Sequence, residues 1–282
     1  MYWLDFLEVD KYRSEGINGD GVKIAVFDKG IQKHVDLNVV GGINAYDETK
    51  SPFLAYNGHG LRVAGIIAGK QTGVAPNASI YSVKLDDNAG GGNDKDAILR
   101  GIDWAIDNDI DIINCSFSYD VDELRLYNKF KQAFDAGIII VCSSGNRQNN
   151  VTDMQDVIRA PAKYPFSVTC ASVNSRKNKA GSSCVGKQVK LSSGGSSVRS
   201  TTVDTTKEVS DKYATGLSGT SYASAGISGV FALYKQMYPQ DSNKKLIERV
   251  FHNAETIGDS WVFGAGLPKY PKSYNNIQIK GR

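Results

Sequence analysis

Four residues whose types can support acyl transfer lie in order along the chain. Asp28 and Asn146 each come at the end of an apolar run. His59 and Ser221 each open a stretch with helical spacing. Together these types can supply a nucleophile, a general base, a carboxylate that orients the base, and a donor to an oxyanion. Taken singly, each has an ordinary alternative as a turn residue or a helix cap.

The apolar pattern predicts the elements that position these residues. The predicted strands cover 22–27, 80–85, 111–115 and 138–142, and the predicted helices cover 59–69, 94–108, 124–136, 220–237 and 242–253. The stretch 166–202 is typical of short strands and turns. Strands rich in Ile and Val that alternate with helices indicate an α/β fold with a mostly parallel sheet buried between helices. Asp28 would then lie at the carboxyl end of a strand, where functional side chains gather.

Composition and charge favour a single domain over 1–282. The 282 residues are 41% hydrophobic, which suffices for one deep core. The chain has 33 Lys and Arg residues against 30 Asp and Glu residues, so its net charge is only +3. No nucleic-acid partner is therefore predicted. No apolar run approaches the roughly 20 residues of a membrane span, so no membrane partner is predicted either. The sequence defines no oligomeric state.

Cysteine usage and the N-terminal residues favour a cytoplasmic location. The chain has too few cysteines for a disulfide framework at this length, which favours reduced thiols at Cys115, Cys142, Cys170 and Cys184. The first ten residues, MYWLDFLEVD, carry three acidic side chains and lack the basic and apolar regions of a secretory signal. A secreted mature form, trimmed of its leading segments, is the alternative.

Four motifs carry a resemblance to a known family. They resemble the signature segments of the subtilisin family, in the family's order of Asp, His and Ser: Asp28-Lys29-Gly30, His59-Gly60 with Val63-Ala64-Gly65, Ser144-Gly145-Asn146, and Gly219-Thr220-Ser221-Tyr222-Ala223-Ser224. The resemblance covers about 19–267 and implies a three-layer subtilisin-like fold. It also implies a serine endopeptidase in which Ser221 attacks the peptide carbonyl, His59 transfers the proton and Asp28 orients His59. Asn146 would then donate to the oxyanion.

The resemblance also implies where a peptide or protein substrate lies. An extended substrate would add a strand to two segments, Gly90-Gly91-Gly92 and Ser116-Phe117-Ser118. The segment Ser143-Ser144-Gly145 would line the site beside Asn146. Arg159 falls where many relatives have a small residue at the floor of the specificity pocket, with either a substrate carboxylate or an internal acid (Asp153 or Asp156) as its partner.

Some positions depart from the family pattern. Lys29 replaces a small hydroxyl residue, Arg62 a second histidine, and Ala225 a proline. The loop 69–73 is short where many relatives carry a longer calcium-binding insertion, and Asp36 would lack partners for that ion. No metal ligand and no cofactor are therefore predicted, although the resemblance leaves room for a weak calcium site.

The intact set of four residues favours an active endopeptidase, made in the cytosol as a processing enzyme without an inhibitory prodomain. Two alternatives stay open. One is an inactive protein that keeps the fold to bind peptides, and the other is a secreted degradative enzyme that has lost its pro-region.

Overall fold

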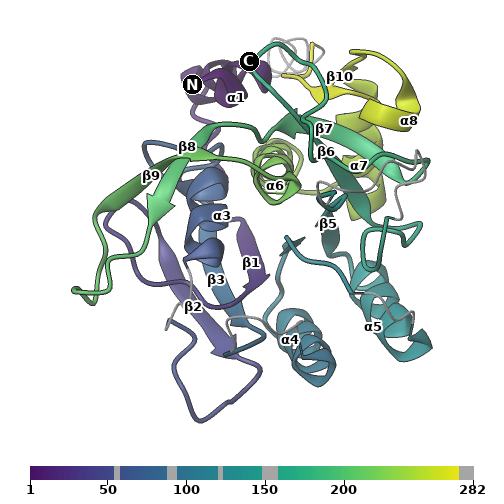
Figure 1. Cartoon of the computed structure of the whole chain (residues 1–282). Helices are drawn as coiled ribbons and strands as arrows, with labels where there is room; N and C mark the ends of the chain where they lie inside the picture. Colours follow the sequence, from purple (N-terminus) through teal and green to yellow (C-terminus); the bar gives the residue numbers. More distant parts are fainter. Residues whose placement is uncertain (54–57, 88–93, 120–122, 148–157, 273–282) are drawn as a thin grey trace.

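A parallel sheet forms the centre of the fold. The computed structural model describes residues 1–53, 58–87, 94–119, 123–147 and 158–272. The sheet has seven strands in the order β2-β3-β1-β4-β5-β6-β7, and each neighbouring pair is parallel (Figure 1). These strands are β1 (Lys23–Asp28), β2 (Val39–Asn44), β3 (Ser79–Lys84), β4 (Ile112–Cys115), β5 (Ile139–Ser143), β6 (Val168–Val173) and β7 (Val189–Gly194). The strand order reverses at β1, and in open parallel sheets functional side chains gather at the carboxyl ends of the strands beside such a reversal.

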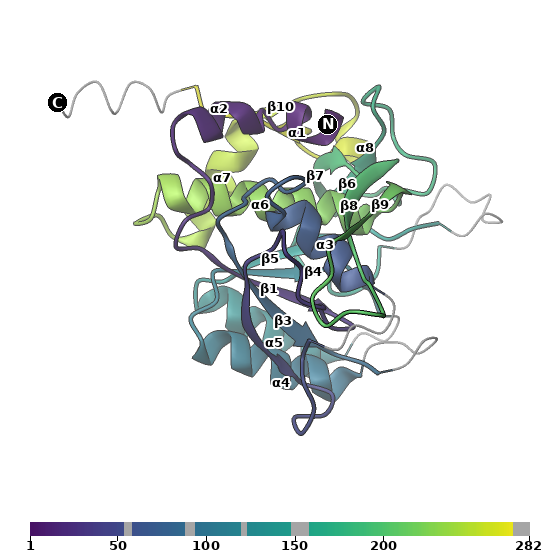
Figure 2. The same ribbon diagram turned by 90° about the vertical axis from the view of Figure 1, so that its left-hand side faces the viewer.

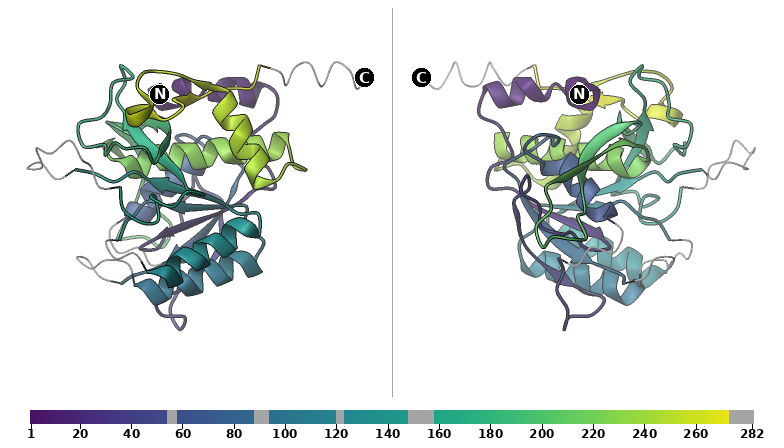
Figure 3. Two further views of the ribbon diagram at one scale, coloured as in Figure 1. Left: turned by 90° about the vertical axis from the view of Figure 1, so that its right-hand side faces the viewer. Right: turned by 60° about the vertical axis from the view of Figure 1, so that its left-hand side comes forward.

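Helices cover both faces of this sheet (Figure 3). One face carries α4 (Lys95–Asp107) and α5 (Leu124–Asp135), and the other carries α3 (His59–Ala68), α6 (Thr220–Met237) and α7 (Asn243–His252). Alternate residues of β1 pack against the helices on opposite faces of the sheet, because successive side chains of a strand point to opposite faces. Val26 packs with α3 and α6, whereas Phe27 packs with α4 and α5. This burial explains the continuous apolar strands and confirms the predicted α/β fold.

A hairpin beside α3 leads the chain into α6 (Figure 2). It consists of β8 (Val198–Thr202) and β9 (Lys212–Leu217), which pair antiparallel. The hydroxyl of Thr201 donates to the Leu61 carbonyl of α3 at 2.8 Å. A Cβ at Gly65 would lie 2.2 Å from the Thr201 hydroxyl oxygen, so glycine is required for this close approach. The hairpin therefore fixes α3 relative to the segment that precedes Ser221.

The N-terminal helices were not predicted from the sequence. α1 (Tyr2–Phe6) and α2 (Val9–Ser14) have five and six residues and no side-chain cap, so they show no helical period in the sequence. Trp3 and Tyr12 are nevertheless buried in the same core as α6. β2 and β9 were also missed. The remaining elements are α8 (Ser260–Phe263) and the short pair β10 (Ala254–Glu255) and β11 (Leu267–Pro268).

In the part of the chain that the structure describes, no helix is long and apolar enough to cross a membrane.

Candidate active site

Asp28 and His59 form a hydrogen-bonded pair at the carboxyl edge of the sheet, in which Asp28 is buried and His59 is half-buried. Asp28 is the last residue of β1, and its Oδ2 lies 2.7 Å from Nδ1 of His59, the first residue of α3. The backbone N–H of Lys29 donates to Asp28 Oδ1 at 2.8 Å. Because an ionised carboxylate only accepts, Nδ1 of His59 carries the proton and Nε2 is left as the basic nitrogen. Attraction by Asp28 raises the pKa of His59, although burial of the ring opposes that rise.

Two glycines allow α3 to begin directly above Asp28. Gly58 precedes the helix in the left-handed region, with φ of 71°. A Cβ at Gly60 would lie 2.7 Å from the Gly30 carbonyl oxygen and 3.0 Å from the Asp28 Cβ. Any larger residue at position 60 would therefore lift the helix away from β1 and break the contact between His59 and Asp28.

Ser221 is the second residue of α6 and is buried, at 7% exposed. Its Oγ donates to the carbonyl of Ser116, which follows β4, at 3.3 Å. The Ser116 hydroxyl lies 3.2 Å from the Ser221 carbonyl in return. The ring of Tyr222 has its centroid 6.2 Å from that of His59, so the start of α6 lies beside the start of α3. The structure thus brings Ser221 to the same edge of the sheet as Asp28 and His59.

Asn146 follows β5 and is oriented by the first residue of α6. Its Oδ1 accepts the backbone N–H of Thr220 at 3.0 Å and the Thr220 hydroxyl at 3.2 Å. Its Nδ2 then faces Gly219, where a Cβ would lie 3.5 Å from Nδ2 and 3.9 Å from the backbone nitrogen of Ser221. Two N–H donors therefore border one small space, as an oxyanion requires. The orienting contact from Thr220 was not predicted, because spacing along the chain does not reveal it.

The predicted substrate-binding residues differ in how far they are buried. Ser143 and Ser144 are buried, and the Ser144 hydroxyl donates to the Cys184 carbonyl at 3.1 Å. The Gly145 carbonyl accepts the N–H of Cys184 at 3.1 Å. The residues that follow β4 become progressively more exposed, from buried Ser116 through half-buried Phe117 to exposed Ser118. Gly90, Gly91 and Gly92 lie outside the described residues.

Arg159, predicted at the floor of the specificity pocket, is exposed. Asp153 and Asp156, its proposed internal partners, lie outside the described residues. The neighbouring Ala160 carbonyl accepts the N–H of Tyr119 at 2.9 Å. The hydroxyls of Tyr119 and Tyr164 lie 3.0 Å apart. These two contacts hold the segment after β4 against the segment that carries Arg159, and neither contact was predicted.

The short loop after α3 donates two backbone N–H groups to Asp36, one to its carboxylate and one to its backbone carbonyl. Asp36 Oδ2 accepts the N–H of Gln71 at 3.1 Å, and the Asp36 carbonyl accepts the N–H of Lys70 at 3.0 Å. Asp36 is buried, at 5% exposed. Among the residues that the structure describes, no group of three or more His, Cys, Asp or Glu side chains is placed to hold a metal ion.

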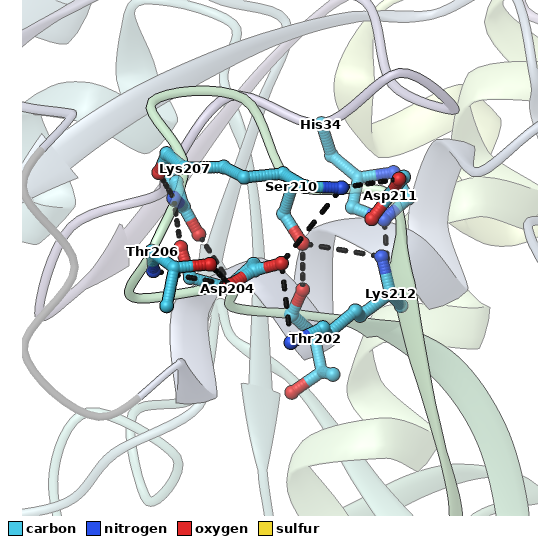
Figure 4. Close-up of polar contacts among 9 residues, drawn as sticks. His34, Thr202, Asp204, Thr206, Lys207, Ser210, Asp211 and Lys212 are labelled. Atoms are coloured by element: carbon cyan, nitrogen blue, oxygen red, sulfur yellow. Dashed lines mark hydrogen bonds and ion pairs between the residues drawn. The ribbon is translucent and has the colours of Figure 1, made fainter.

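The loop between β8 and β9 is held by a buried carboxylate (Figure 4). Asp204 Oδ1 accepts the N–H and the hydroxyl of Thr206 at 3.0 and 2.6 Å, and Lys212 Nζ lies 3.1 Å from Asp204 Oδ2. The hydrogen bonds from Thr206 lower the pKa of Asp204 to about 2, against the effect of burial. Gln32, which follows β1, binds the same loop through the backbone of Asp204. The loop is therefore fixed to the segment after β1.

Known proteins are similar to this chain in sequence and in fold. The subtilase family matches residues 19–266. The chain is 36% identical to the minor extracellular protease Epr of Bacillus subtilis (strain 168), over 95% of this chain and 40% of that protein. It is 35% identical to subtilisin DY of Bacillus licheniformis, over 94% of this chain and 95% of that protein.

Among solved structures, fervidolysin from Fervidobacterium pennivorans, described as a keratinolytic enzyme related to subtilisin, superposes with a TM-score of 0.83. That alignment covers 95% of this chain and 44% of fervidolysin, at 25% identity. MycP1 without its N-terminal propeptide shares the fold, with a TM-score of 0.80 over 97% of this chain and 96% of that one, at 22% identity. The chain belongs to the subtilase family, and its class is that of a subtilisin-like serine endopeptidase.

Proposed function

We propose that this protein hydrolyses peptide bonds with Ser221 as nucleophile, His59 as general base and Asp28 as the residue that orients His59. The single observation that carries the proposal is the 2.7 Å contact between Asp28 Oδ2 and His59 Nδ1. That contact fixes the imidazole tautomer with Nε2 unprotonated, which a general base for a serine hydroxyl requires. It also stabilises the imidazolium that forms when the proton moves.

The proposed reaction proceeds in two halves. Ser221 Oγ attacks the scissile carbonyl while its proton passes to His59, and the carbonyl oxygen becomes an oxyanion. The Nδ2 group of Asn146 and the backbone N–H of Ser221 donate to that oxyanion. His59 then gives its proton to the leaving amine, and a water molecule repeats the sequence on the acyl-enzyme. We propose no metal ion or cofactor for this chemistry.

The proposed substrate is a peptide or protein segment in extended form. Ser118 is exposed just beyond the buried β4, which supports pairing of a substrate strand along 116–118. Arg159 is exposed on a segment held to the same stretch, and we propose that it interacts with an acidic side chain of the substrate.

We propose an intracellular processing role. The support is the state of the four cysteines, which are buried and form no disulfide in the described part of the chain. Free thiols are typical of a reducing compartment, whereas secreted proteins more often pair theirs. A secreted degradative enzyme is the second candidate, because the relative Epr is named an extracellular protease. Fractionation of the native host, with the protein detected by antibody, distinguishes the two locations.

Active-site labelling tests the catalytic proposal. A fluorophosphonate probe should react covalently with the wild type at Ser221, and Ser221→Ala should lose both labelling and peptide cleavage. Asn146→Ala should still be labelled but more slowly, with kcat lower by roughly 10²–10³-fold, the effect known for such a donor in the relative subtilisin. A folded wild type that neither reacts nor cleaves would instead support a peptide-binding protein without catalysis.

A further inference from the structure

A cavity of about 400 Å³ lies between three segments of the chain, and none of its lining residues belongs to the proposed triad. Gln32 and Lys33 come from the segment after β1, Phe53 from the segment after β2, and Val203 and Lys207 from the loop between β8 and β9. Phe53 and Val203 are half-buried and supply an apolar surface, whereas the two lysines are exposed. The cavity therefore joins an apolar part to a charged rim.

Hydrogen bonds from Gln32 fix the walls of this cavity. Its Nε2 donates to the carbonyl of Asp204 at 2.9 Å and to the carbonyl of Lys207 at 2.6 Å, and its Oε1 accepts the N–H of Asp204 at 2.9 Å. The carboxylate of Asp204 accepts two hydrogen bonds from Thr206 within the same loop (Figure 4). A site whose walls are already held in place loses little conformational freedom when a ligand binds.

The cavity adjoins the start of α3, where the proposed general base lies. A Cβ at Gly58, the residue before His59, would lie 3.1 Å from each of the two methyl carbons of Val203. In the strand order β2-β3-β1-β4, the segment after β2 lies on one side of β1, and the segment 116–118, which follows β4, lies on the other. Because His59 gives its proton to the leaving amine in the proposed reaction, we expect the residues after the scissile bond on the side of His59 that faces away from 116–118.

Lys33 gives the cavity a positive charge that no carboxylate of the protein neutralises. Its ammonium lies 5.1 Å from the centroid of the Phe53 ring, and it forms no ion pair within the part of the chain that the structure describes. Lys207, in contrast, pairs with Asp211 at 2.7 Å. Glu208 borders the same cavity with the opposite charge, so it should weaken the attraction of Lys33 for a carboxylate without removing it.

We propose that this cavity is a specificity site for the substrate segment after the scissile bond, and that it accepts an acidic residue. The Asp or Glu carboxylate pairs with the Lys33 ammonium, while the methylene groups of the same side chain lie against Phe53 and Val203. Lys33 touches the substrate but not the reacting bond, so it determines which substrate is chosen rather than how the bond is broken. The inference deepens the proposed peptidase function and rests on it.

A peptide series tests the charge that the cavity prefers. The residues before the scissile bond are held constant, and Glu, Gln or Lys is placed in turn at each of the first four positions after it. For the wild type, kcat/KM with Glu should exceed that with Gln by roughly two- to fivefold at one position, the range of a solvent-exposed ion pair. Lys33→Met should abolish the difference, Lys33→Glu should reverse it in favour of Lys, and Glu208→Gln should enlarge it.

Lys187→Glu is the matched control for the charge reversal. Lys187 is exposed and precedes β7, at the opposite edge of the sheet from β2. The substitution changes the net charge of the protein as much as Lys33→Glu does, so it should leave the preference for Glu at that position unchanged. Equal rates with Glu, Gln and Lys at all four positions would overturn the inference. So would a preference for Lys in the wild type, or a preference for Glu that Lys33→Met retains.

A substrate that ends in p-nitroaniline directly after the scissile bond separates the inference from the proposed function. It carries no residue that could enter the cavity, so its hydrolysis by the wild type depends on the proposed triad alone. If the wild type hydrolyses neither this substrate nor the peptides, the proposed function fails, and binding to the Ser221→Ala variant then decides the inference. The Glu peptide should bind Ser221→Ala two- to fivefold more tightly than the Gln peptide, and Lys33→Met in that background should remove the difference. Equal dissociation constants for the two peptides would overturn the inference.

Discussion

Thr220 holds the carboxamide of Asn146 by its oxygen, with the backbone N–H at 3.0 Å and the hydroxyl at 3.2 Å from Oδ1. An amide oxygen that accepts two donors defines the amide orientation, because a flipped amide would turn its NH₂ group onto them. Nδ2 therefore faces the space beside Gly219 before any substrate arrives. Donors that are already oriented stabilise an oxyanion without reorganisation during the reaction.

Thr220→Val should therefore lower kcat by roughly two- to tenfold while KM changes little. The valine keeps the backbone N–H contact and the shape of the side chain but loses one hydrogen bond to Oδ1, and such a bond contributes about 0.5–1.5 kcal/mol. Thr220→Ser, which retains the hydroxyl, is the control and should remain close to the wild type. Steady-state kinetics on one peptide substrate provide the measurement. A rise in KM at constant kcat would show that Thr220 acts on substrate binding instead.

The residues proposed to react could be chosen from the sequence, because the four motifs that carry them resemble, in type and order, those of the subtilisin family. Asp28, His59, Asn146 and Ser221 each follow a strand or open a helix, and the apolar pattern placed those boundaries to within a few residues. A parallel sheet then requires the carboxyl ends of its strands to lie at one edge. That is why the fold class and the convergence of these four residues could be predicted together.

The contacts that support these residues could not be predicted from the sequence in the same way. Thr220 meets Asn146 across 74 positions of the chain, and Tyr119 meets Tyr164 across 45. Neither pair has a spacing that a helix or a turn would impose. The short helices α1 and α2 were missed for a related reason, since burial of residues such as Trp3 in the core stabilises these helices more than their own helix propensity does.

Substitution at Arg159 should change which residue is preferred before the scissile bond. The side chain is exposed, so a contact with a substrate carboxylate is screened by water. We expect Glu or Asp to exceed Leu in kcat/KM by roughly two- to fivefold. Arg159→Gly should abolish that preference and Arg159→Lys should retain part of it. A peptide library varied only at this residue gives the comparison. An aromatic preference that Arg159→Gly leaves unchanged would contradict the expectation.

Removal of divalent cations should change stability little. Two backbone N–H groups of the loop 69–73 approach Asp36, one at its carboxylate and one at its carbonyl, and they supply donors where longer loops bring ligands. A ligand that binds only the native state stabilises it by RT ln(1 + [L]/Kd), so a weak site contributes almost nothing. We expect EDTA to move the melting temperature by less than about 1 °C. A large decrease that calcium reverses would reveal a tight site elsewhere.

Asp204→Asn should destabilise the protein near neutral pH and should matter less as the solution becomes acidic. In the folded protein the pKa of Asp204 is about 2, below its ordinary value of 3.8, chiefly because Thr206 donates two hydrogen bonds to the ionised form. A carboxyl group with a lowered pKa stabilises the fold above its ordinary pKa, and that stabilisation is lost as the pH falls through the folded value.

The difference in melting temperature between Asp204→Asn and the wild type should therefore be a few degrees at pH 7. It should narrow as the pH falls from about 4 toward 2. Asp211→Asn is the control, since Asp211 is half exposed and, within the part of the chain that the structure describes, forms its ion pair with Lys207 of the same loop. It should change the melting temperature much less at every pH. A loss of stability in Asp204→Asn that stays constant down to pH 3 would mean that the neutral side chain, rather than the charge, holds the loop between β8 and β9.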